Sequence, residues 1–114
     1  MNEALTEQKA ADALAALGNR TRLRLFKLLV RAGTDGLIVG EIQRQMEMPA
    51  STLAHHLAAL TRAGLVVQER KGREVVSTAD YASMQRLLGW LTEECCAGVG
   101  GACGDGTCAN GLVA

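Results

Sequence analysis

The residues of this chain best suited to chemistry are its four cysteines, which all lie within the last twenty residues. They are Cys95, Cys96, Cys103 and Cys108, with the spacing C-C-x6-C-x4-C. In 114 residues with no visible secretory segment, thiols grouped in this way indicate metal binding or redox chemistry before structural disulfides. Thiolates are soft ligands and select thiophilic ions. The adjacent pair does not supply the C-x2–4-C spacing of a usual tetrahedral zinc site.

A helix and a glycine-rich tail must position these thiols. Asp80 is a suitable N-cap for a last helix with one continuous apolar stripe. Residues 97–114 hold six of the thirteen glycines and no Lys or Arg, so we expect a flexible tail that can fold back on that helix. The sequence thus predicts a domain over residues 1–96 and a tail over 97–114. The stripe consists of Met84, Leu87, Leu88, Leu91 and Cys95.

The net charge of zero hides a strong segregation of charge along the chain. Residues 20–73 hold ten Lys/Arg and four Asp/Glu, a balance of +6, whereas residues 1–19 carry −2 and residues 74–114 carry −4. A basic middle between acidic ends is typical of a surface that faces DNA. The apolar runs are too short to span a bilayer, so we expect a soluble, cytoplasmic protein.

The middle of the chain has the pattern of a helix-turn-helix. Thr6 can cap a first helix that ends near Leu17, and a second helix is expected from about Arg20 to Arg31. The second helix has a predicted inner side of Leu23, Phe26, Leu29 and Val30 and a solvated side of Arg20, Arg24, Lys27 and Arg31. A short helix over residues 39–47, a break at Met48-Pro49 and a helix to about Ala63 complete the motif.

The last of these helices has one face suited to the major groove. Leu53, His56, Leu57 and Leu60 share the side that must pack on the domain. Hydroxyl, imidazole and guanidinium groups on the other side can meet phosphates and base edges. We expect His56 to be a half-buried structural residue. The predicted DNA contacts of this helix are Ser51, Thr52, His55 and Arg62.

Two Val-rich runs, "LVVQER" and "REVVST", flank a basic turn at Lys71-Gly72 and predict a β-hairpin. Its basic residues Arg70, Lys71 and Arg73 are the expected contacts with the phosphate backbone or a minor groove, although a solvated turn is the alternative for any single one of them. The fold class is therefore mainly α with a small hairpin, a winged helix-turn-helix.

The strings "LGNRTRLRLFKLL" and "STLAHHLAALTRAGLVVQERKGREVV" resemble the ArsR/SmtB family of metalloregulatory repressors, over about Ala13 to Leu91. The resemblance implies a homodimer joined by the first and last helices. It also implies repression of a resistance operon through an imperfect inverted repeat, with two recognition helices about one DNA turn, ~34 Å, apart. The sequence shows no catalytic motif that would indicate an enzyme. An architectural DNA-binding protein that responds to no inducer is a further alternative.

One departure from the family's pattern directs attention to the tail. Well-known arsenite sensors of the family carry Cys-x-Cys in the first helix of the helix-turn-helix, where this chain has "LIVGEI". The resemblance and the softness of thiolates together imply a three-thiolate site for As(III) or Sb(III) on Cys95, Cys96 and Cys103, with Cys108 a spare or a substitute. A thiol redox switch and a Zn or Cd site on all four sulfurs stay open as alternatives.

Overall fold

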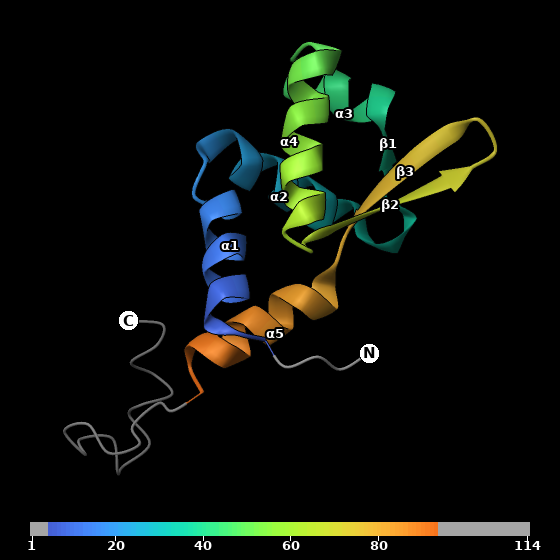
Figure 1. Ribbon diagram of the computed structural model, residues 1–114. Coiled ribbons are helices and arrows are strands. Elements are labelled where there is room, and N and C mark those ends of the chain that lie inside the picture. The colour runs from blue at the N-terminus through green and yellow to red at the C-terminus, as the bar shows by residue number, and fades with distance from the viewer. Residues whose placement is uncertain (1–4, 94–114) are drawn as a thin grey trace.

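The computed structural model describes residues 5–93. Figure 1 shows their order along the chain. Across these residues, no helix has the length and apolar character needed to cross a membrane. The elements are α1 (Glu7–Leu17), α2 (Arg20–Ala32), the 3-10 turn η1 (Gly33–Asp35), β1 (Leu37–Ile38), α3 (Val39–Met46), α4 (Ala50–Arg62), β2 (Val66–Lys71), β3 (Glu74–Ala79) and α5 (Tyr81–Leu91).

Polar side chains cap three of the helices. The Thr6 hydroxyl accepts a hydrogen bond from the Lys9 amide at 3.1 Å, and the Asp80 carboxylate accepts one from the Ser83 amide at 3.0 Å. Both caps confirm the sequence prediction. Asn19 caps α2 by accepting from two backbone amides of its first turn. Such caps satisfy amides that have no partner inside the helix, and each stabilises its helix by about 1 kcal/mol.

The predicted hairpin is present, and it belongs to a three-stranded antiparallel sheet with the order β1-β3-β2. Lys71 pairs with Glu74, so the turn consists of Gly72 and Arg73, one residue later than the expected centre. Gly72 has a φ of 66°, which suits glycine at the tip of a tight hairpin. The two-residue strand β1 has no counterpart in the predicted elements, because two residues are too few to show an alternating pattern.

The core forms where α4 packs on α2 and α1. The expected inner face of α4 is confirmed, with Leu53, Leu57 and Leu60 buried. In α2 the expected face is partly wrong: Leu25 is fully buried, whereas Leu23 and Val30 are 46% and 37% exposed. The buried side of α2 faces α1, α4 and β3, so it is rotated from the predicted stripe. The α1 helix packs through small side chains, Ala10, Ala13 and Ala16.

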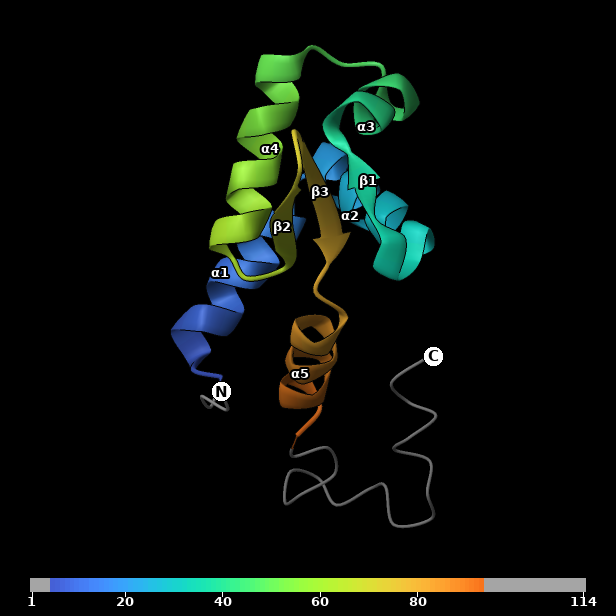
Figure 2. The ribbon, with the colours of Figure 1, turned by 90° about the vertical axis from the view of Figure 1, so that its right-hand side faces the viewer.

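The two ends of the molecule carry different elements. In Figure 1, α3, the start of α4 and the tip of the β2–β3 wing lie on the side away from α5. Figure 2 shows α5 continuing from β3 at the opposite end, near the first turns of α1. The α3 helix, the start of α4 and the wing tip therefore lie at the end of the domain opposite α5.

Gly36 offers a test of how β1 is joined to the sheet. Its φ is 67°, and an added Cβ would lie 2.5 Å from the Ser77 carbonyl oxygen and 2.7 Å from a methyl of Val76. Gly36→Ala therefore combines an unfavourable backbone conformation with a clash against β3. We expect a loss of about 2–5 kcal/mol in the free energy of unfolding, measured by urea denaturation.

Gly33→Ala is the matched control for this change. Gly33 has a similar φ of 71°, but nothing lies within 4 Å of its added Cβ. It should lose only about 1–2 kcal/mol from the backbone conformation. Equal losses in the two variants would contradict the close approach of Gly36 to β3.

Candidate DNA-binding surface

The outer side of α4 is open to solvent along its length. Ser51, Thr52, His55 and Arg62 are all exposed, while Leu53, Leu57 and Leu60 hold the opposite side in the core. The helix starts after a turn in which Glu47 adopts a left-handed conformation with φ 53°, and Pro49 precedes the first helical residue. The four side chains predicted to contact DNA therefore share one accessible surface, which we call the α4 face.

The two adjacent histidines lie in different environments, as the sequence predicts. His55 belongs to the α4 face. His56 is half-buried, and its Nδ1 accepts a hydrogen bond from Nε of Arg22 on α2 at 3.2 Å. Burial lowers the pKa of His56, and the nearby charges of Arg22 and His55 lower it further. His56 is thus held as a neutral structural ring.

The wing carries the second group of predicted contacts. Arg70, Lys71 and Arg73 are exposed at the tip of the β2–β3 hairpin, where Arg73 forms part of the two-residue turn and the other two precede it. The hairpin places these cations together, and Figure 1 shows the tip extending away from the helical body. Two separate cationic or polar groups, one on α4 and one on the wing, are therefore accessible for contacts with a polyanion.

The sequence pattern did not predict the contact that Arg22 makes with His56. From the sequence, Arg22 contributes only to the basic charge of residues 20–73, because a contact between residues 34 positions apart leaves no local pattern. The remaining basic residues of α2 are exposed, as expected for a solvated face: Arg20, Arg24, Lys27 and Arg31.

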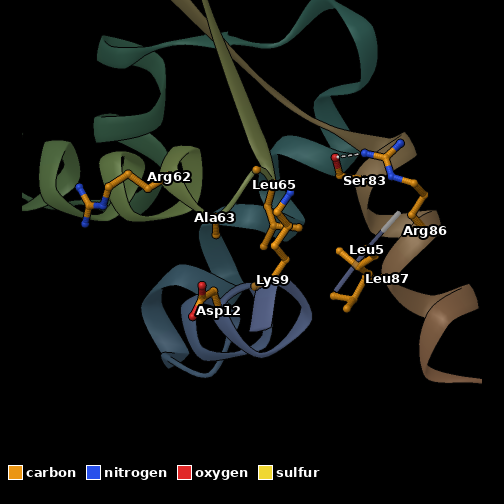
Figure 3. A pocket seen from close by; sticks show the side chains of 11 residues that line it. Leu5, Lys9, Asp12, Arg62, Ala63, Leu65, Ser83, Arg86 and Leu87 are labelled. Atoms are coloured by element: carbon orange, nitrogen blue, oxygen red, sulfur yellow. Dashed lines mark hydrogen bonds between the residues drawn. The ribbon is translucent and has the colours of Figure 1, made fainter. Parts of the chain in front are cut away.

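A cavity of about 470 Å³ lies where α1, the end of α4 and α5 meet (Figure 3). Leu5, Leu65 and Leu87 supply apolar walls, and Lys9 and Arg86 supply basic groups. Arg86 donates a hydrogen bond to Ser83 at 3.0 Å. Arg62 also borders the cavity, but Figure 3 shows its guanidinium extending away from α5. This junction joins the end of the α4 face to the last helix.

Apolar side chains remain exposed on the two outer helices. Leu88 and Leu91 of α5 are 50% and 49% exposed, and Leu14 of α1 is 41% exposed. The predicted stripe of α5 is therefore divided, because Leu87 is buried in the body while its neighbours face outward. The helix ends at Leu91, and its cap Thr92 donates from its hydroxyl to the Leu88 carbonyl oxygen at 3.1 Å.

The proposed sulfur ligands Cys95, Cys96, Cys103 and Cys108 lie outside the described residues, as does the tail over 97–114. Within residues 5–93, no group of three or more His, Cys, Asp or Glu side chains is arranged to hold a metal ion.

Comparison with known proteins agrees with the helix-turn-helix geometry. A family model described as a helix-turn-helix domain matches residues 17–69. An uncharacterized HTH-type transcriptional regulator of Methanocaldococcus jannaschii is 37% identical over 65 residues, 57% of this chain and 71% of the relative. The transcriptional activator HlyU of Vibrio cholerae is 31% identical over 80 residues, 70% of this chain and 71% of the relative. A putative arsenical resistance operon repressor of Halobacterium salinarum is 37% identical over 60 residues, which cover 53% of this chain and 46% of that protein.

Solved structures extend the similarity to the whole fold. An ArsR family regulator superposes with a TM-score of 0.67 at 21% identity, over 81% of this chain and 92% of the other. Reduced HlyU from Vibrio cholerae has a TM-score of 0.57 at 34% identity, over 74% and 88%. A homodimeric winged helix-turn-helix domain of a possible ArsR-family regulator from Mycobacterium bovis has a TM-score of 0.59 at 27% identity, over 76% and 81%.

The fold, the open α4 face, the basic wing and these relatives lead to one assignment. The chain belongs to the helix-turn-helix transcriptional regulators of the ArsR/HlyU type.

Proposed function

We propose that this regulator is a homodimeric repressor that binds an imperfect inverted repeat in operator DNA and leaves it when As(III) or Sb(III) binds the cysteines beyond α5. The single observation that carries the proposal is the grouping of all four cysteines in the last twenty residues, directly after the last helix. The arsenical resistance repressor among the relatives supports the choice of ligand.

Contact with DNA is assigned to the α4 face and the wing. The short polar groups Ser51, Thr52 and His55 suit base edges in the major groove, and Arg62 suits a phosphate or a guanine. The wing cations Arg70, Lys71 and Arg73 suit the phosphate backbone, where they release counterions and strengthen binding to any sequence.

Dimer formation is assigned to the outer sides of α1 and α5. Three half-exposed leucines, Leu14, Leu88 and Leu91, lie on these helices. Burying each of them would contribute about 1.5–3 kcal/mol on the scale of full side-chain burial, less for the part already covered. The homodimeric relative from Mycobacterium bovis supports this assembly.

The inducer site is assigned to the thiolates of Cys95, Cys96 and Cys103, with Cys108 as a spare or a substitute. Soft thiolates bind trivalent arsenic and antimony well, and each thiol gives up its proton on binding. Gathering three thiolates beyond α5 would order the tail against that helix. Release of DNA then requires a coupling free energy between the two sites of about 1–3 kcal/mol.

A thiol redox switch is the second candidate. The same cysteines could form a disulfide between the pair Cys95-Cys96 and either Cys103 or Cys108, with no metal. The similarity to HlyU, one structure of which is of the reduced protein, gives this candidate its support.

The first prediction separates the two groups of DNA contacts. Arg73→Ala should weaken binding to operator and unrelated DNA alike and should reduce the salt slope by about 0.9. Thr52→Ala should cost about 1–3 kcal/mol on operator DNA only. Fluorescence anisotropy over a range of salt concentrations measures both. Lys27→Ala on α2 removes an exposed charge away from both groups and is the control; an equal loss in that variant would contradict the assignment.

The second prediction concerns the dimer. Leu88→Glu should shift the protein toward monomer in sedimentation velocity and reduce operator binding strongly, because a carboxylate would be buried in the contact. Val67→Glu is the matched control, since Val67 is 48% exposed on the sheet, away from α1 and α5. A dimer that tolerates Leu88→Glu as well as Val67→Glu would place the contact elsewhere.

The third prediction concerns the inducer. Arsenite and antimonite should release the DNA of the gene's own promoter from the wild-type protein. Cys95→Ser and Cys96→Ser should abolish this response, while Cys108→Ser should retain it. Loss of the response in Cys103→Ser would identify Cys108 as a spare, and a retained response would identify it as the substitute. Trp90, the one tryptophan, lies half-buried on α5, so its fluorescence should report ligand binding without DNA.

The alternatives give different results in the same titration. Release by peroxide with reversal by a thiol reductant would favour the redox switch. Release by Zn(II) or Cd(II) while arsenite and antimonite leave the complex intact would contradict the three-thiolate site.

A further inference from the structure

Arg22 joins the helix that bears the DNA-facing groups to the rest of the domain through a polar contact. Its Nε lies 3.2 Å from Nδ1 of His56, and both side chains are half-buried between α2 and α4. The Arg22 amide also donates to the Asn19 side chain at 3.1 Å, so the turn that carries Arg22 is itself capped. The backbone that carries Arg22 is therefore held in place at the start of α2.

We propose that Arg22 is a positioning residue for operator recognition: its bond to neutral His56 fixes the orientation of α4, and protonation of His56 releases that bond and lowers sequence-specific binding. The inference rests on α4 as the helix that reads DNA. It adds a proton-sensitive contact outside the DNA-binding surface and outside the cysteine site.

The buried leucines of α4 cannot fix its orientation in the same way. Leu53, Leu57 and Leu60 form one row, and apolar packing is non-directional, so it tolerates small rotations and slides of the helix. A hydrogen bond weakens steeply when its angle changes. His55 directly precedes His56 in the helix, about 100° around its axis, so a rotation that breaks the Arg22 contact also turns the α4 face.

The chemistry of the contact makes it sensitive to protons. Nδ1 accepts from Arg22, so the single proton of the neutral ring must sit on Nε2. A protonated ring carries hydrogens on both nitrogens, cannot accept, and would face a guanidinium as a second cation. Within residues 5–93, the charged or titratable groups that act on the ring are Arg22 from α2 and His55 from α4.

The sign of the pH dependence follows from the lowered pKa of His56. The unfolded chain takes up a proton on this histidine near pH 6.5, whereas the folded protein resists protonation until a lower pH. The hydrogen bond between Arg22 and His56 therefore stabilises the native state fully above about pH 6.5. This contribution is lost as the pH falls through the folded-state pKa of His56.

Two measurements test the proposal, and the first needs no DNA. Nitrogen chemical shifts of the His56 ring in the whole protein should show the Nε2-protonated form at neutral pH, with a pKa below the ordinary value of a histidine. Arg22→Met should abolish the preference for that form. A wild-type ring protonated on Nδ1 would overturn the proposal whether or not α4 reads DNA.

The second measurement is DNA affinity as a function of pH in a His55→Asn background, which leaves His56 as the one histidine of the chain. Between about pH 7.5 and pH 5.5, the ratio of affinities for the gene's own promoter duplex and an unrelated duplex of the same length should fall by about three- to tenfold. Adding His56→Asn should flatten this profile, because Asn keeps an acceptor oxygen near the position of Nδ1 and does not titrate.

If the affinity ratio depends on pH in the same way with and without His56→Asn, the proposal is overturned. Arg22→Met should lower the same ratio at about pH 7.5 by a similar factor, and full retention of the ratio would also overturn it. If Arg22→Met does not fold, which circular dichroism reports, the His56→Asn profile and the ring shifts still decide the outcome.

Discussion

The packing of α4 on α2 is the constraint on which the rest of this protein depends. Leu25 and Leu29 of α2 and Leu53 and Leu60 of α4 are fully buried, and each contributes about 1.5–3 kcal/mol to folding. Because these leucines occupy one side of α4, the polar groups on its other side can only face outward. The wing depends on the same packing, since the turn after α4 leads into β2 through buried Leu65 and Val66. The same few contacts therefore hold the domain together and decide which side of α4 is exposed.

The sequence predicted best where one side of a helix was clearly apolar and the other clearly polar. In α4 this contrast placed both histidines correctly, because His56 falls among leucines and His55 among hydroxyls. In α2, apolar residues lie on several sides of the helix, so helical periodicity alone favoured a buried Leu23 over a buried Leu25. The elements packed against α2 decide which of the two is buried, and it is Leu25. The contact between Arg22 and His56 was beyond prediction because tertiary folding alone brings residues 34 apart together.

The segment "LIVGEI" shows what a sensing site inside the helix-turn-helix would displace in this chain. It forms β1 and the first turn of α3, with Ile42 fully buried and Leu37 and Val39 packed against the core. The Glu41 carboxylate accepts a hydrogen bond from the Ile38 amide at 3.0 Å and so closes the start of α3. Thiolate ligands here would replace side chains that hold the sheet to the helix-turn-helix. The proposed site beyond α5 would leave this packing intact, but it would have to act from a greater distance.

The effect of a ligand bound beyond α5 on the DNA-binding helices would depend on how firmly α5 is attached to the rest of the domain. Leu87 is its one buried residue within the described chain, and the junction with α1 and α4 contains a cavity. A helix with little buried surface can shift for a small free energy, comparable to the 1–3 kcal/mol typical of coupling between sites. Its outer leucines face the side where a second subunit is proposed, so a shift of α5 would alter both that contact and the junction next to Arg62. Weak attachment of the last helix is thus what would allow a ligand beyond it to influence a rigid DNA-binding unit.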